Sequence, residues 1–119
     1  MILTVTDAGV TAVFTPRGEI GFDTLPGVLA RAQEVPHTAT GVTWDLRQAR
    51  FMDVAGLHLL IHQRLVCQGT GRILTVVGLQ QQPKRLLDLA WELFPDNHWD
   101  DFLPGGLLAA AYWSPHHRP

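Results

Sequence analysis

The sequence predicts an α/β fold in which a mixed β-sheet of four to five strands packs against three to four α-helices. Its 119 residues fit one domain, and 46% of them are apolar, which is enough for a single core. Strand-like segments, in which apolar and polar residues alternate, are each followed by a segment with helical periodicity. This succession of strands and helices implies parallel crossover connections on one sheet. We expect residues 1–113 to form the domain and residues 114–119 to form a flexible tail.

The N-terminal segment predicts a β-hairpin followed by a helix. Leu3 and Val5 alternate with threonine residues, as in a strand, and residues 10–15 alternate again after a turn signal. Asp23 and Thr24 offer an N-cap for the helix that follows. One face of this helix carries Leu25, Val28, Leu29 and Ala32.

The middle of the chain predicts a strand at residues 41–46 and a helix at residues 54–67, capped by Asp53 and followed by Gly69 and Gly71. Two apolar ridges run along this helix: Leu57, Leu60, Ile61 and Leu65 on one side, and Ala55, Leu59 and Val66 on the other. One ridge must face the sheet. The other either packs against a neighbouring helix or is exposed as a partner surface.

The last third of the chain predicts a buried strand at residues 73–77, where nearly every residue is apolar, and a helix after residues 80–83. We expect the apolar side chains of this helix to face inward: Leu86, Leu87, Leu89, Ala90 and Leu93. Residues 99–103 are expected to form a short last strand, and residues 106–112 a final helical segment.

Composition and charge argue against several functional classes. Nine basic and eleven acidic residues leave a formal net charge of -2, without the basic character of a nucleic-acid-binding protein. No apolar run approaches the roughly 18–20 residues that span a bilayer, and the start of the chain lacks a signal-peptide pattern. The single cysteine, Cys67, is expected to be a plain buried thiol, which fits a reducing, cytoplasmic setting.

Residues 44–57 carry the most specific motif, Trp-Asp-Leu-Arg-Gln-Ala-Arg-Phe-Met-Asp-Val-Ala-Gly-Leu. By itself, Asp53 within it is either only a helix cap or part of a functional site. Together with Gly-Glu-Ile at residues 18–20 and Pro-Lys-Arg-Leu-Leu at residues 83–87, the segment resembles the signature of STAS domains, the fold of bacterial anti-sigma factor antagonists. The resemblance extends over most of the chain and implies a STAS-like α/β fold.

In phosphorylatable members of that family, a serine or threonine directly follows the aspartate, and an anti-sigma factor kinase modifies it. Val54 occupies this position here, and valine has no nucleophilic oxygen, so the resemblance implies no phosphoacceptor at this site. The acidic residue that follows Gly-Glu-Ile in the family is replaced by Gly21, with Asp23 two residues further on.

The resemblance implies a non-enzymatic protein-interaction module that binds an anti-sigma factor, a Ser/Thr-kinase-like protein, without the usual phosphorylation switch. The alternative is an accessory STAS subunit of a transporter, of the lipid ABC type, or of another signalling complex. We expect no cofactor, and a homodimer is compatible with the sequence. The residues expected to contact the partner are Gly21, Asp23, Arg50, Met52, Asp53, Val54, Ala55 and His58. Among them, Val54 and Ala55 are expected to give apolar contact, and Arg50 and His58 polar contact at the rim.

His58 and His62 are four residues apart on the predicted helix, so both side chains can reach one metal ion. The glutamate that follows the first histidine in zinc-protease helices is replaced by Leu59, and no Cys or further His is placed to complete a site. We therefore expect no metal there. The sequence also lacks the glycine-rich nucleotide-binding motifs and the G-x-S-x-G motif of serine hydrolases.

Overall fold

Strands and helices alternate along the chain after an N-terminal hairpin. The computed structural model describes residues 1–7 and 9–102. The strands are β1 (Ile2–Thr6), β2 (Gly9–Phe14), β3 (Gly18–Ile20), β4 (Ala39–Asp45), β5 (Ala49–Met52) and β6 (Ile73–Val77). The helices are α1 (Leu25–Ala32), α2 (Val54–Thr70) and α3 (Gln81–Leu93), followed by two short 3-10 helices, η1 (Pro95–Asn97) and η2 (Trp99–Phe102).

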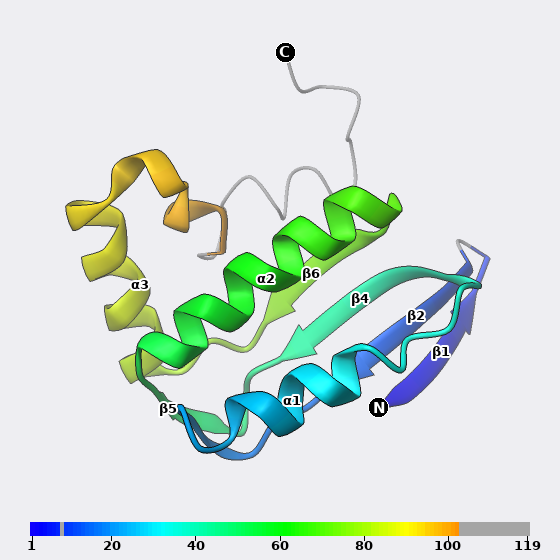
Figure 1. Cartoon of the computed structure of the whole chain (residues 1–119), viewed down its shortest axis with the longest axis horizontal. Helices are drawn as coiled ribbons and strands as arrows, with labels where there is room; N and C mark the ends of the chain where they lie inside the picture. Colours follow the sequence, from blue (N-terminus) through cyan, green and yellow to red (C-terminus); the bar gives the residue numbers. More distant parts are fainter. Residues whose placement is uncertain (8, 103–119) are drawn as a thin grey trace.

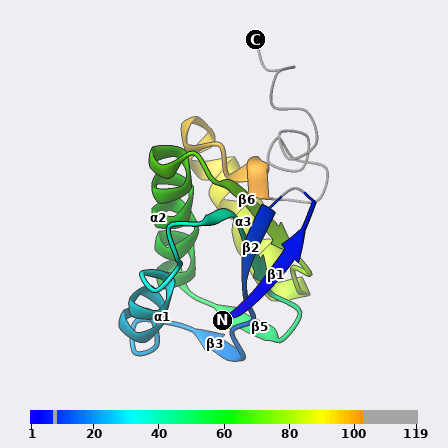
Figure 2. The same ribbon diagram turned by 90° about the vertical axis from the view of Figure 1, so that its right-hand side faces the viewer.

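Four strands form the main sheet in the order β1-β2-β4-β6. β1 pairs with β2 in antiparallel fashion, whereas the pairs β2–β4 and β4–β6 are parallel. α1 and α2 lie on one face of this sheet, and α3 stands beside the amino-terminal half of α2 (Figures 1 and 2). The predicted hairpin and the mixed α/β architecture are therefore confirmed. Every helix within the described residues is too short or too polar to span a bilayer.

Two short strands form a second sheet that the sequence does not predict. β3 and β5 pair in parallel, with Ile20 opposite Met52. The sequence predicts no strand in either segment, because three or four residues are too few to show a period-2 pattern. Ile20 and Met52 are fully buried, and their pairing brings the loop before α1 next to the loop before α2.

The core lies between the main sheet and the helices and contains one buried polar pair. Phe14 and Trp44, from neighbouring strands, stack with ring centroids 4.6 Å apart. The indole Nε1 of Trp44 donates a hydrogen bond of 3.1 Å to Oε1 of Gln63, which is buried on the inner face of α2. Because the two polar atoms bond each other, their burial leaves neither of them without a hydrogen bond and avoids the free-energy cost of an unpaired polar group.

Four further predictions were wrong or lie outside the described residues. Residues 99–102 form the 3-10 helix η2 and not a strand. Trp99 and Phe102 are three residues apart and both buried, a spacing that puts them on one side of a 3-10 helix but on opposite faces of a strand. Leu89 and Leu93 of α3 are about half exposed and do not face inward. The helical segment predicted at residues 106–112 and the predicted tail lie outside the described residues.

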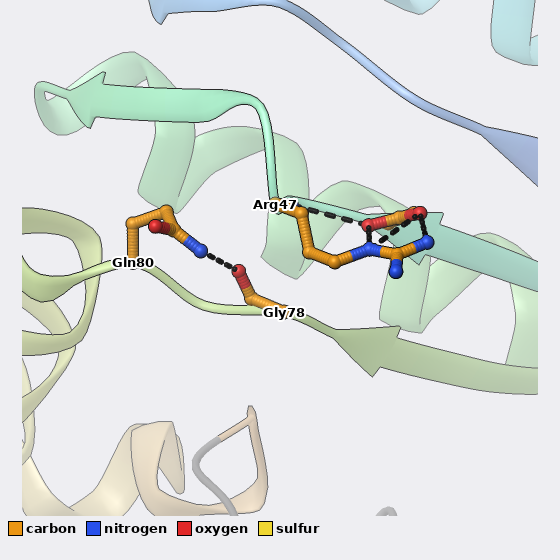
Figure 3. Close-up of polar contacts among 4 residues, drawn as sticks. Arg47, Gly78 and Gln80 are labelled. Atoms are coloured by element: carbon orange, nitrogen blue, oxygen red, sulfur yellow. Dashed lines mark hydrogen bonds and ion pairs between the residues drawn. The ribbon is translucent and has the colours of Figure 1, made fainter.

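The connection between β4 and β5 is held against the end of β6. Asp45 accepts hydrogen bonds from the backbone N–H of Arg47 at 3.1 Å and from its guanidinium at 2.6 Å. This turn lies beside Gly78, whose φ is +72°, and the Gly78 carbonyl accepts a hydrogen bond of 2.8 Å from Gln80 (Figure 3). A Cβ on Gly78 would overlap the Arg47 side chain and lie 3.0 Å from the Arg47 backbone nitrogen. Only glycine therefore fits here without displacing the turn.

Gly78→Ala is expected to lower the free energy of unfolding by about 1–3 kcal/mol, because the new Cβ combines a positive φ with an overlap against backbone. Urea unfolding of both proteins measures the loss. Gly71→Ala is the matched control, since Gly71 also has a positive φ of 69° but open space around its Cβ position. Equal losses in the two variants would show that the contact with Arg47 has no influence.

The Asp45–Arg47 pair also predicts a pH dependence. Hydrogen bonding from Arg47 holds the pKa of Asp45 below its usual value of 3.8, although desolvation by burial opposes this shift. Because the folded state favours the carboxylate, the pair stabilises the fold above the usual pKa, and this contribution is lost as pH falls through the lowered pKa. Arg47→Gln is expected to raise the pKa of Asp45, measured by NMR titration of its carboxyl carbon. The difference in the free energy of unfolding between Arg47→Gln and the parent protein is expected to shrink as the pH falls. A difference that does not change with pH would contradict this expectation.

Candidate partner-binding site

α2 begins at a capping aspartate. Asp53 has extended backbone angles (φ -102°, ψ -162°), and its Oδ1 accepts a hydrogen bond of 2.7 Å from the backbone N–H of Ala55. This bond satisfies one of the N–H groups that the first helical turn leaves free. The N–H of Asp53 donates to the carbonyl of Ile20 at 3.2 Å. Asp53 is therefore the predicted helix cap, and it also joins β3 to α2.

The residue before the cap is held by a side chain from α3. Oε1 of Gln82 accepts a hydrogen bond from the backbone N–H of Met52, and Nε2 of Gln82 donates one to the carbonyl of Met52, both at 2.9 Å. One amide thus pairs both backbone groups of Met52, much as a neighbouring strand would. This role of Gln82 is not visible in the sequence, because Gln82 lies in a run of three glutamines and no pattern distinguishes it from the other two.

Two glycines allow neighbouring segments to approach this junction closely. A Cβ on Gly56 would lie 2.7 Å from the Cβ of Met52, and a Cβ on Gly21 would lie 3.1 Å from Oδ2 of Asp53. The N–H of Gly21 donates to Oγ1 of Thr24 at 2.9 Å, which fixes the turn before α1. The structure therefore brings the predicted site residues Gly21 and Asp53 together at the start of α2.

Four of the predicted contact residues are open to a partner. Val54, the first residue of α2, has 51% of its surface exposed. Asp23, Arg50 and His58 are exposed as well. Val54 therefore presents an uncharged, apolar side chain at the position where the helix start offers its free N–H groups.

For two residues the prediction of partner contact is wrong, because they are buried. Met52 and Ala55 are fully buried, so neither offers surface to a partner in this conformation. Ala55 belongs to the inner face of α2, together with Leu59 and Gln63, and Met52 packs under Gly56. These residues shape the site from beneath and leave Val54 as its apolar contact.

A groove with a volume of about 480 Å³ runs from this site between α2 and α3. From α2 it is lined by Val54, Leu57, His58 and Ile61. From α3 it is lined by Leu86, Leu89, Ala90 and Leu93. Each set follows the i, i+3, i+4, i+7 spacing of one helical face, so two apolar stripes face the same space. The predicted ridge of α2 is therefore not one surface: Leu57 and Ile61 line the groove, whereas Leu60 is buried and Leu65 is exposed outside the groove.

An arginine of α2 holds the segment that follows α3. Arg64 of α2 donates hydrogen bonds to the carbonyls of Asn97, at 2.6 Å, and His98, at 3.1 Å. Its guanidinium lies 4.9 Å from the centre of the Phe102 ring and 3.4 Å from a carboxylate oxygen of Asp101. Desolvation by burial lowers the pKa of Arg64, and the nearby acidic residues oppose this shift. These bonds hold η1 and η2 against α2.

The two helical histidines have different surroundings. His62 Nδ1 lies 3.3 Å from Nε2 of Gln63, whereas His58 lines the groove. Among residues 1–7 and 9–102, no three His, Cys, Asp or Glu side chains are grouped to hold a metal ion. Cys67 is buried, as predicted, and desolvation raises the pKa of its thiol.

Comparisons with known proteins bear on the fold. The family model described as STAS domain matches residues 2–93. A crystal structure of a sulfate transporter family protein from Wolinella succinogenes has a similar fold, with a TM-score of 0.63 and 16% sequence identity over 87% of this chain and 85% of that chain. At this identity the likeness concerns the fold alone. No curated protein matches the sequence significantly.

Asp53→Ala is expected to lower the free energy of unfolding by about 1 kcal/mol, because the cap hydrogen bond to Ala55 is lost. Asp53→Asn keeps an acceptor oxygen and is expected to lose only a fraction of that amount. Urea unfolding compares the two variants, and amide hydrogen exchange at Ala55 reports the cap directly. An Asn variant as unstable as the Ala variant would mean that charge, and not the hydrogen bond, stabilises the helix start.

Proposed function

This chain belongs to the STAS domain family, and on that premise we propose that it is a binding module resembling an anti-sigma factor antagonist. STAS domains are modules of the protein-interaction type. The proposed partner is an anti-sigma factor, a Ser/Thr-kinase-like protein, whose capture would release a sigma factor. The observation that carries the proposal is the exposed Val54 on the first turn of α2, beside the Asp53 cap.

Val54 makes the proposed module independent of the usual off-switch. A phosphate at this position would add a charge of about -1.5 to -2 next to the carboxylate of Asp53. Valine has no oxygen to accept a phosphoryl group, so the surface keeps its apolar character whatever kinase is active. On this proposal, binding is governed by the amount of free partner or by another ligand of the same surface.

The proposed contact surface has an apolar centre and a polar rim. Val54 supplies the centre, and the exposed Asp23, Arg50 and His58 supply polar groups around it. Gly21 and Asp53 are half-buried and set the shape of the surface between them. An apolar centre within a polar rim is the usual arrangement of a protein–protein interface.

We place the module in the cytoplasm and assign it no cofactor and no chemistry of its own. Self-association is supported by β1, an edge strand of the main sheet, which pairs with β2 and with no other strand of the part of the chain that the structure describes. Its apolar side chains are exposed, with Val5 at 76%. An apolar edge with unpaired backbone groups is a template for pairing with another chain.

The alternative is an accessory subunit of a transporter complex, of the lipid ABC type, or of another signalling complex. The observation that favours it is the absence of a phosphoacceptor at Val54, since a subunit held permanently in a complex needs no phosphorylation switch. The same surface at the start of α2 would then dock on a transporter component. The two functions differ in the class of protein bound.

Val54→Glu is expected to reduce recovery of the partner about tenfold or more, because an interface would have to bury a second carboxylate beside Asp53. The measurement is a pull-down from the native host with mass-spectrometric identification. With the parent chain as bait, we expect to recover a kinase-like anti-sigma factor.

Val66→Glu is the matched control, since Val66 lies on the same helix, is 37% exposed and is far from the Asp53 cap. This variant is expected to recover as much partner as the parent chain. Equal recovery by Val54→Glu would place the contact elsewhere. Recovery of a transporter ATPase without any sigma-regulatory protein would favour the alternative.

A further inference from the structure

The backbone of β1 is open on one side. β1 pairs with β2 from Ile2, opposite Val13, to Thr6, opposite Gly9, and with no other strand within the described residues. Figure 2 views the molecule from this side, with β1 in front of the other strands. In an antiparallel pair, every second residue points its N–H and C=O away from the partner strand. The edge of the sheet therefore offers a row of backbone groups that another strand can satisfy as a set.

The side chains of β1 leave an apolar row of the sheet incomplete. On the face that α1 and α2 cover, one row across the four strands consists of Leu3, Ala12, Val42 and Leu74. The three inner members are at most 4% exposed, whereas Leu3 at the edge is 48% exposed. Val5 lies on the same face as Leu3 and is 76% exposed. Apolar side chains placed beside these two residues would extend the buried row.

β1 lacks the features that usually keep edge strands from pairing. Its sequence, Ile-Leu-Thr-Val-Thr, contains no charged residue and no proline, and all five residues are exposed. Its register with β2 runs without a shift. Edge strands are commonly protected by a lysine, a proline or a bulge. The edge is therefore suited to pairing with a strand that is also uncharged.

We propose that two copies of this chain pair their β1 strands in antiparallel fashion, about a two-fold axis beside Thr4. A residue whose backbone groups point outward must face another such residue, so odd-numbered residues face odd-numbered ones. With Thr4 opposite Thr4 of the second copy, Leu3 faces Val5 and Ile2 faces Thr6, so that the whole of β1 is paired. An axis at Leu3 or Val5 would leave part of each β1 without a partner.

A second copy fits this edge in its side chains and in its charge. Leu3 and Val5 of both copies meet on one face of the joined sheet and form an apolar cluster. Asp7, the charged residue nearest to β1 along the chain, comes to opposite ends of the paired strands. The two Asp7 residues are then about 20 Å apart, which exceeds the screening length of about 8–10 Å in physiological salt. The contact also closes on itself, because it uses the β1 edges of both copies.

The dimer leaves the proposed partner surface accessible. Figure 1 places the start of α2 on the other side of the molecule from β1, so Val54 of each copy stays open and the dimer presents two such surfaces. The interface gives the proposed self-association a definite register and does not depend on the identity of the partner. The purified chain alone tests it, so a negative result leaves the role proposed for Val54 unaffected.

Sedimentation velocity of the full chain, at concentrations on the order of 1–500 μM, tests the dimer. We expect reversible dimerisation with a dissociation constant on the order of 10–100 μM, because the paired strands make a small interface. Val5→Lys is expected to weaken dimerisation about tenfold or more, since it places a charge beside Leu3 of the second copy. Val77→Lys is the matched control and is expected to dimerise as the parent does, because Val77 is 41% exposed on β6, the opposite edge strand.

Cysteine variants test the register. Thr4→Cys brings two thiols together across the axis, because Cα atoms of facing residues are about 4.5–5.5 Å apart, which is within the range of a disulfide. Ile2→Cys is the control: Ile2 lies on the same face of β1, but the two copies of it are about 13 Å apart in this register. We expect diamide to link Thr4→Cys into a covalent dimer about tenfold or more faster than Ile2→Cys. The buried Cys67 is present in both variants.

Any one of several results would overturn the proposal. The parent chain stays monomeric over the whole concentration range, or Val5→Lys dimerises as the parent does. A dimer that Val77→Lys dissociates and Val5→Lys does not would place the interface at β6. Equal rates of linkage for Thr4→Cys and Ile2→Cys would exclude the register, and this comparison stands even if Val5→Lys loses stability.

Discussion

The paired hydrogen bonds between Gln82 and Met52 determine how the rest of this surface is arranged. Both backbone groups of Met52 are satisfied by one side chain of α3, each at 2.9 Å. The next residue, Asp53, caps α2 and donates its own N–H to Ile20. Three segments that are distant in sequence therefore meet within two residues. The position of α3 beside α2, and with it the groove, follows from this junction.

The same junction explains why neighbouring apolar residues have different roles. Met52 and Ala55 point into the core, while Val54 between them is half exposed. In the first turn of a helix, adjacent side chains are about 100° apart, so Val54 points in a different direction from the buried Ala55 and is half exposed. The exposure of Val54 is thus a consequence of the Asp53 cap, which fixes where the helix begins.

The sequence predicted features that depend on local chemistry and missed those that depend on tertiary contacts. The Asp53 cap, the hairpin of β1 and β2 and the buried Cys67 follow from neighbouring residues and were found. β3 and β5 were missed because they are too short to show a period, and Gln82 because its role exists only where α3 meets β5. Leu89 and Leu93 were placed inside because helical spacing identifies an apolar face without showing whether anything covers it.

The groove and the proposed partner surface share residues, and this overlap has a thermodynamic consequence. Val54 and His58 belong to both. A ligand in the groove and a protein docked on Val54 would compete, and each would weaken the binding of the other by the same factor.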